Sequence, residues 1–464
     1  MKTAKKVLLI ILSILMVFTC KRYTEPEGSN TANEQDNGTG IVGGGDNGNS
    51  IAANDTGPLS GSGGGTQVGN WTLPRNSLSQ EEQNQDYDPE YNSMVLFENG
   101  GIPALTTTST GVLIAAVGDY DGNIFVKRSL DSGYTWLTSQ LGAGANSRNP
   151  FFINCHNGDV LLGITTTSND YTNTIFYRSS DNGATWTREV EIQVQDVAKT
   201  ATGQTITNFV TYGQGVTLRH GANAGQNKLL FPYYYLTNSQ NKNATGVWTT
   251  TITSDNDGIT WNNNINNIKA DVKTRKGGNP LGSFTSYESK LYETYDGNIL
   301  INMRSADWKK TSTTGQNNVM YWSRSSDCGQ NWTITTVLQE ESANGKHADL
   351  VRYEFNGKPI KTEGLKYGLM ALSHYGQNSY SVKLTTNDFN NGDKSGSKYA
   401  YTGEIVANSG VSDGYPAITV LSDGTIGTLT EEADSSTKII FRRFNLYWLT
   451  YGEESVDYST DLRY

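Results

Sequence analysis

Glu288 and Arg304 are the two residues of this sequence whose types and spacing most directly allow joint chemistry. Between them lies an alternating stretch interrupted by the turn residues Asp296-Gly297, which predicts two antiparallel strands joined by a hairpin. A hairpin of that length brings its two ends side by side, so a carboxylate base and a carboxylate-binding guanidinium can share one pocket. The alternative is an ordinary ion pair across a surface hairpin.

The sequence around this pair has the pattern of a β-protein, whose strands must position the two side chains. From about residue 87 onward, short apolar or alternating runs are bounded by Gly, Asn or Asp. Examples are residues 112–117, 159–164, 228–235 and 298–303. No stretch sustains an amphipathic helical period, so we expect a nearly all-β domain.

An eight-residue pattern, Ser-x-Asp-x-Gly-x-Thr-Trp, recurs along this domain. Two close copies begin at Ser129 and Ser179, and two looser copies begin at Ser254 and Ser325. The Asp can accept hydrogen bonds from turn amides, the Gly tolerates a positive φ, and the Trp buries a large flat ring. Because a β-run precedes the copies, we expect each to cap a hairpin.

These four copies resemble the Asp-boxes of the sialidase (neuraminidase) family, and the resemblance covers essentially all of the chain after its first 86 residues. It implies a six-bladed β-propeller, with four-stranded blades of about 60 residues each. The boxes themselves are structural, so they carry the fold and not the activity.

The resemblance also implies a site for retaining hydrolysis of terminal sialic acid, with a Tyr nucleophile in place of the usual carboxylate. It assigns Tyr415 as the nucleophile, Glu288 as its base and Arg304 as one of three arginines that clamp the sugar carboxylate. Asp119 or Asp121 falls where the acid/base belongs. The alternatives are a packing aromatic at position 415 and ordinary turn aspartates at 119 and 121.

Two positions depart from the family pattern. Gly101, before Ile102-Pro103, stands where the first arginine is expected, and Gln377 stands where the third is expected. Each lost charge-assisted contact weakens carboxylate binding by about 1.5 to 3 kcal/mol. Arg148, Arg219 and Arg352 are candidates to compensate, although each also fits a solvated or structural role.

Composition excludes several classes of function. The chain has 464 residues, with Lys+Arg 36 against Asp+Glu 46 and a net charge of -10, so it lacks the basic surface that duplex DNA binding requires. No Cys/His spacing resembles a zinc site, and we expect neither a metal nor a cofactor. We expect Cys155 and Cys328 to be unpaired cysteines on different blades.

The N-terminus is typical of an exported protein. A basic start and a short apolar run predict a signal peptide over residues 1–19, followed by lipidation of Cys20 and attachment to a bacterial membrane. Gly, Asn and Ser then dominate residues 20–86, which we interpret as a disordered linker. The predicted propeller occupies residues 87–452, and a C-terminal tail covers 453–464.

Three hypotheses for function follow. The first is an exo-α-sialidase that removes terminal sialic acid from sialylated glycoconjugates. The second is a glycan-binding propeller without activity, and the third is an exoglycosidase for a different sugar. The missing arginines motivate the second and third. In each case the partners are sialylated or related glycans and, through the N-terminal lipid, a membrane.

Overall fold

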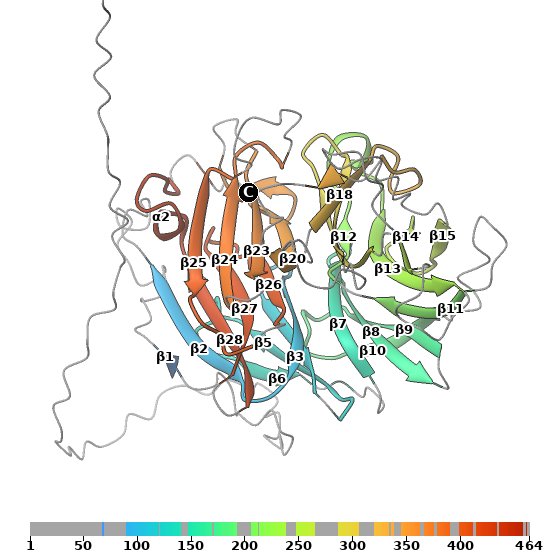
Figure 1. Ribbon diagram of the computed structural model, residues 1–464, viewed down its shortest axis with the longest axis horizontal. Helices are drawn as coiled ribbons and strands as arrows, with labels where there is room; N and C mark the ends of the chain where they lie inside the picture. The colour runs from blue at the N-terminus through green and yellow to red at the C-terminus, as the bar shows by residue number, and fades with distance from the viewer. Residues whose placement is uncertain are drawn as a thin grey trace, which may run out of the picture. The chain divides into compact units, whose positions relative to one another are not determined.

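Apolar strands form six antiparallel sheets arranged as the blades of a β-propeller (Figure 1). The computed structural model describes residues 67–68, 90–119, 121–139, 141, 147–168, 171–192, 206–211, 213–237, 247–264, 286–305, 320–333, 336–337, 345–361, 366–374, 378–389, 399–411, 414–433, 436–457 and 461. Cys20 and the predicted signal peptide lie outside these residues.

The blades follow one another in chain order. The first comprises β3 (Gly101–Thr107), β4 (Leu113–Gly118), β5 (Ile124–Ser129) and β6 (Leu137–Ser139). The second comprises β7 (Ser147–Asn154), β8 (Val160–Ser168), β9 (Tyr171–Ser179) and β10 (Thr187–Ile192). The third contains β11 (Ile206–Thr211), β12 (Val216–Thr217), β13 (Leu229–Thr237), β14 (Val247–Ser254) and β15 (Asn262–Asn264).

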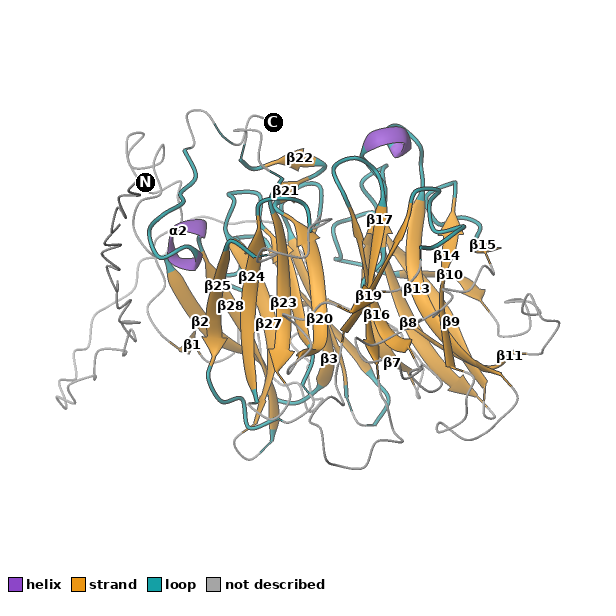
Figure 2. Ribbon diagram, turned by 45° about the horizontal axis from the view of Figure 1, so that its top comes forward, coloured by secondary structure: helices purple, strands orange, loops and turns teal. Residues whose placement is uncertain are grey.

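The second half of the ring repeats this plan. The fourth blade comprises β16 (Ser286–Glu293), β17 (Ile299–Ser305), β18 (Met320–Ser325) and β19 (Thr336–Val337). The fifth comprises β20 (Gly345–Arg352), β23 (Gly368–His374), β24 (Ser379–Thr385) and β25 (Tyr401–Val406). A separate two-stranded hairpin, β21 (Glu354–Phe355) and β22 (Lys358–Pro359), follows β20 (Figure 2).

The sixth blade joins the two ends of the domain. Its strands follow the order β26 (Pro416–Val420), β27 (Ile426–Ala433), β28 (Thr437–Phe444), β2 (Tyr91–Phe97) and β1 (Gln67–Val68), so the C-terminal strand β28 pairs with β2 from the start of the domain. Figure 1 shows blue β2 beside the orange-red strands of this blade, which closes the ring non-covalently. The all-β six-bladed fold expected from the sequence is confirmed, and the one α-helix among the described residues is the single turn α2 (Leu446–Leu449).

Apolar side chains hold each blade against the next. Ile114 and Ala116 of the first blade pack with Phe152 and Leu162 of the second, and all four are essentially excluded from solvent. Burial of this kind stabilises by about 25 cal/mol per Å² of apolar surface, so the stacked sheets supply most of the driving force. Polar residues near the two ends of the inner strands are therefore available to form sites at the two faces of the ring.

The first strand of each blade lies innermost, where β3, β7, β16, β20 and β26 contact their neighbours around the ring. Several inner strands carry a β-bulge at their start, marked by register shifts and by positive φ angles at Ile102 (51°), Asn149 (53°) and Glu288 (48°). Bulges re-aim side chains and gather next to active sites. We refer to this end of the inner strands as the site end, and to the other as the far end.

The repeated eight-residue pattern caps hairpins, as expected. In the first copy, Asp131 Oδ1 accepts from Ser129 Oγ and Thr135 N, both at 2.8 Å, and Oδ2 accepts from Thr135 Oγ1 at 2.6 Å. Trp136 Nε1 donates to the Gly133 carbonyl oxygen at 3.1 Å. The other three copies repeat the amide-to-side-chain bond at the corresponding position, with Asn256 replacing Asp in the third.

Gly133 illustrates how tightly these caps fit, and Gly133→Ala is predicted to destabilise the fold by about 3 kcal/mol. Its φ is +94°, and an added Cβ would lie 2.5 Å from Phe441 Cε1. Gly225→Ala is the matched control, because φ is +74° there but no heavy atom lies within 4 Å. Urea unfolding should therefore give a control loss of about 1 kcal/mol, the strain of positive φ alone. Equal losses in the two variants would contradict this packing.

Cys155 follows β7 and Cys328 follows β18, so the two thiols belong to different blades and are unpaired, as expected. Burial raises the pKa of Cys155 to about 12, which leaves it an inert thiol.

No helix in the described part of the chain has the length and apolar character needed to span a bilayer. Part of residues 453–464 packs on the domain, since Lys361 Nζ donates to the Ser455 carbonyl oxygen at 2.8 Å.

Candidate active site

Tyr415, Glu288 and Arg304 meet at the site end of the inner strands. Tyr415 Oη donates to Glu288 Oε1 at 2.8 Å, and Arg304 Nη1 donates to Glu288 Oε2 at 2.6 Å. Arg304 lies opposite Tyr287 in the β16–β17 register, so the hairpin does bring the two ends together. The Glu288 and Arg304 side chains are only 9% and 14% exposed, so this is a buried pair and not a surface one.

His347, at the start of β20, completes the cluster and was missed by sequence reasoning. Its ring stacks on Tyr415 with centroids 3.7 Å apart, and its Nδ1 lies 3.0 Å from Glu288 Oε2. Arg304 Nη1 lies 3.1 Å from His347 Nε2. The imidazole therefore contacts Tyr415 through its ring face and both members of the Glu288–Arg304 pair through its two nitrogens. No motif surrounds His347 in the sequence; its position at the start of an inner strand is the signal that could have found it.

Glu288 is held as a carboxylate at some cost in backbone strain. Burial alone would raise its pKa, but the neighbouring His347 and Arg304 outweigh it and lower the pKa to about 2. The residue sits at φ 48° inside a bulge, a conformation that costs on the order of 1–3 kcal/mol and gathers at functional sites. The two carboxylate oxygens have different partners: Oε1 accepts from the Tyr415 phenol, and Oε2 contacts Arg304 and His347.

Gly101 lies beside a second buried carboxyl group, that of Glu431 on β27. A Cβ at Gly101 would lie 3.4 Å from Glu431 Oε1, and the same oxygen accepts from Ile102 N at 2.5 Å. Glu431 is 6% exposed and forms no ion pair with any described residue. Burial, opposed by amide hydrogen bonds from Ile102 and Tyr415, raises its pKa to about 7. Where the sialidase resemblance calls for an arginine, this site has a carboxyl group.

The two candidate acid/base aspartates lie at the turn that follows β4. Asp119 accepts from Asn123 N at 2.7 Å and from Asn123 Nδ2 at 2.9 Å, which matches an ordinary turn-capping aspartate. Asp121 is exposed. Neither carboxylate forms a hydrogen bond with Tyr415 or Glu288.

The arginines considered as substitutes divide between the two ends. Arg148 is exposed at the start of β7, and its Cα is 3.8 Å from a Cβ built at Gly118, the residue paired with Gly101. Arg352 ends β20, five residues beyond His347 and therefore about 17 Å away along the strand. Arg148 is thus at the site end and Arg352 at the far end.

Two further observations complete the site. Gln377, the expected substitute for the third arginine, lies outside the described residues. Lys290, two residues beyond Glu288 on β16, was also missed; burial lowers its pKa, while the carboxylates of Asp349 and Glu288 act in the opposite direction.

Comparison with solved structures shows where this fold occurs. The intramolecular trans-sialidase from Ruminococcus gnavus, solved with oseltamivir carboxylate, superposes with a TM-score of 0.54 at 16% identity, covering 76% of this chain and 95% of that chain. The leech intramolecular trans-sialidase gives 0.53 at 16% identity, covering 76% and 69%. A protein of unknown function from Dyadobacter fermentans gives 0.51 at 14% identity, covering 75% and 94%.

At these identities the likeness shows the fold, a sialidase-like six-bladed propeller. No family model and no curated protein matches the sequence. The assignment of activity therefore depends on the geometry of the site.

Proposed function

We propose that the protein is a retaining exoglycosidase of the sialidase type that removes terminal sialic acid from glycoconjugates. The observation that carries the proposal is the 2.8 Å hydrogen bond from Tyr415 Oη to Glu288 Oε1, with Oε2 held by Arg304. A tyrosine has a pKa of about 10 and is a poor nucleophile at neutral pH without such a base.

In the proposed reaction, Tyr415 Oη attacks the anomeric carbon while its proton passes to Glu288 Oε1. The bond to the aglycone breaks, and the leaving oxygen takes a proton from Asp119 or Asp121. Water then attacks the glycosyl-tyrosine, the same aspartate takes the water proton, and Glu288 returns its proton to the phenolate. The sugar leaves with its original anomeric configuration because the two displacements cancel.

The substrate carboxylate would be bound at the site end by two arginines. Arg304 donates to Glu288 through Nη1, and Arg148 makes no hydrogen bond or ion pair with the described residues. Planar guanidinium forks suit a carboxylate better than a point charge does. Export and attachment of the enzyme to a membrane through Cys20 belong to the same proposal, and they agree with a glycan partner outside the cytoplasm.

A second candidate is a glycosidase of the same mechanism whose sugar lacks a carboxylate. Gly101 and Glu431 favour it, because a buried carboxyl group next to the binding position accepts hydrogen bonds and repels an anion. An amino or hydroxyl group of the sugar would suit that position. This candidate differs from the first in substrate and not in the roles of Tyr415 and Glu288.

The two candidates are separated by Gly101→Arg. A Cβ there meets only ordinary van der Waals contact, and the new guanidinium would be next to Glu431. If the substrate is a sialoside, KM should fall by about tenfold or more, the value of one charge-assisted contact. If the substrate lacks the carboxylate, KM should rise instead. KM for each class of substrate is measured from the release of a fluorogenic aglycone, with an α-sialoside for the first candidate and neutral and amino-sugar glycosides for the second.

The same assay on the unaltered chain tests the proposal itself. Turnover of the sialoside supports the first candidate, and turnover of another glycoside alone supports the second. Binding to a glycan array without turnover of any glycoside would overturn both and leave the glycan-binding propeller as the function.

A further inference from the structure

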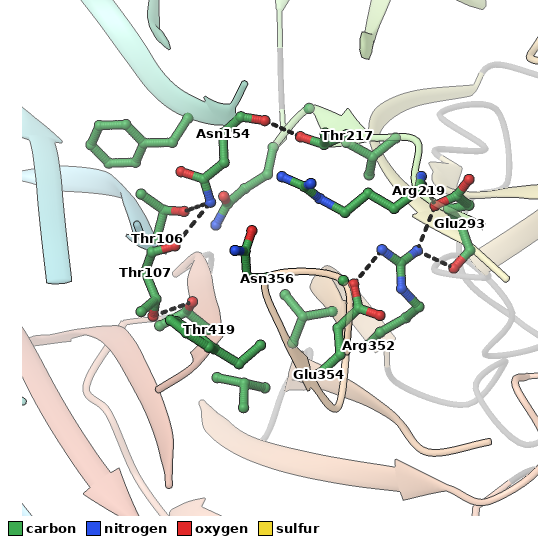
Figure 3. Close-up of a pocket in the computed structure, with 18 of the residues that line it drawn as sticks. Thr106, Thr107, Asn154, Thr217, Arg219, Glu293, Arg352, Glu354, Asn356 and Thr419 are labelled. Atoms are coloured by element: carbon green, nitrogen blue, oxygen red, sulfur yellow. Dashed lines mark hydrogen bonds and ion pairs between the residues drawn. The ribbon is translucent and has the colours of Figure 1, made fainter. Parts of the chain in front are cut away.

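A polar cavity of about 160 Å³ lies at the far end of the inner strands. It is lined by Thr106 and Thr107 at the end of β3, Asn154 at the end of β7, Thr217 of β12 and Thr419 of β26 (Figure 3). Since Glu288 lies near the start of β16 and Glu293, which lines the cavity, ends that strand five residues later, the cavity lies about 17 Å along the strands from the candidate active site. We refer to it as the far cavity.

Arg219 extends into the far cavity with an uncommitted guanidinium group. Its side chain makes no hydrogen bond or ion pair with any described residue, whereas the neighbouring Arg352 is paired with Glu293 at 3.0 Å and with Glu354 at 2.5 Å. Figure 3 shows the contrast, with dashed contacts around Arg352 and none at the Arg219 guanidinium. The donors of Arg219 are therefore directed at the space that the cavity leaves open.

The nearby carboxylates are already engaged by other donors. Glu293 accepts from the backbone N–H groups of Arg219 and His220, at 2.8 and 3.1 Å, besides Arg352. Glu354 accepts from His220 Nε2 at 2.8 Å and from Arg352. Burial lowers the pKa of Arg219, a direction that means its neighbours do not fully offset the desolvation of the cation.

The β21–β22 hairpin forms the outer wall of the far cavity and positions Arg219. Its tip, Asn356-Gly357, has positive φ angles of 49° and 80°, and Asn356 is labelled inside the opening in Figure 3. A Cβ at Gly357 would lie 2.8 Å from Arg219 Cδ. The missing side chain at 357 therefore makes room for the stem of the arginine, which holds its guanidinium over the cavity.

We propose that the far cavity is a binding site for a small oxyanion, a carboxylate or a phosphate, recognised by Arg219. The guanidinium presents a planar fork that matches either group, and the Asn356 amide and the Thr106 hydroxyl, whose oxygen accepts from Asn154 Nδ2, can add neutral hydrogen bonds. A volume of about 160 Å³ is enough for an anion of this size. This site is independent of the proposed glycosidase activity.

Isothermal titration of the full-length protein with inorganic phosphate, and separately with malonate, tests the site. We expect one saturable event in at least one titration, and the preferred ligand distinguishes the two sources of the oxyanion. Arg219→Gln keeps much of the stem and should weaken binding at least tenfold, the loss of a charge-assisted pair. Arg188→Gln, which removes the same charge from the exposed outer strand β10, should bind like the unaltered protein.

A second variant guards against misfolding of Arg219→Gln. Asn356→Asp retains a residue type that tolerates positive φ and places a carboxylate at the opening, so it should also weaken binding while the thermal midpoint stays unchanged. Absence of saturable heat for both ligands up to about 10 mM would overturn the proposal, since a charge-assisted site in a formed cavity should bind more tightly than that. Equal affinities of the unaltered protein and a folded Arg219→Gln would overturn it as well.

Discussion

Tyr415→Phe is expected to lower kcat by on the order of 10³-fold or more, with little change in KM, because it removes only the attacking oxygen. Its ring can keep the stacking on His347, which has a centroid distance of 3.7 Å, so the site should retain its shape. Steady-state kinetics on whichever fluorogenic glycoside the unaltered protein turns over give the measurement. Tyr451→Phe is the matched control, since that tyrosine is 75% exposed and donates to Thr402 O.

Glu288→Gln extends this test to the base. An amide cannot take the phenol proton, so kcat should fall by about 10²- to 10⁴-fold, the usual contribution of a positioned acid or base. Because the pKa of Glu288 is about 2, the carboxylate form is present throughout the range above pH 3. Any acidic limb in the pH profile near pH 4 to 6 must then arise from another group. If both variants keep most of their activity, Tyr415 and Glu288 are not the catalytic pair.

Glu431→Gln is expected to change how stability depends on pH. The pKa of Glu431 is raised from 4.5 to about 7 by burial, so the folded state binds the proton more tightly than the unfolded state does. The unaltered protein should therefore be favoured below pH 4.5 and lose about 3 kcal/mol as the pH rises from 4.5 through 7. The glutamine cannot ionise and retains an acceptor for the Ile102 amide, so it avoids that loss.

Urea unfolding at pH 4.5 and at pH 8 measures this difference. The control is Glu404→Gln, which removes an equal charge from an exposed position on β25. The difference between the two pH values should shrink for Glu431→Gln and stay unchanged for the control. The unaltered protein and Glu431→Gln could instead lose stability in parallel above pH 4.5. That result would show that the Glu431 carboxyl group beside Gly101 is not desolvated.

Local contacts explain which parts of this protein can be predicted from its sequence. The hydrogen bonds of the repeated turn join residues within four positions of each other, as between Asp131 and Thr135, so a short pattern carries them. The Glu288–Arg304 pair lies across one hairpin and follows from its spacing. The repeated turn supports the family resemblance that implied the propeller, and the hairpin spacing predicts two residues of the candidate site, Glu288 and Arg304.

Contacts between blades could not be read in the same way. Tyr415 and Glu288 are 127 residues apart, and only the resemblance to a known family joined them in advance. His347 has no neighbouring motif, and its role depends on the start of β20 lying next to the start of β16. Arg352 looked equivalent to Arg148 in the sequence, although a position at the end of an inner strand places it at the opposite face.

The pairing of β2 with β28 has a consequence for how the domain reaches its native state. The backbone N–H of Glu90 donates to Asn445 Oδ1 across 355 residues, so the ring cannot close until the last blade has been synthesised. Contacts of such long range slow folding, and an unclosed chain leaves the edge of β28 unpaired. Until β2 pairs with β28, that exposed strand edge can pair with another chain.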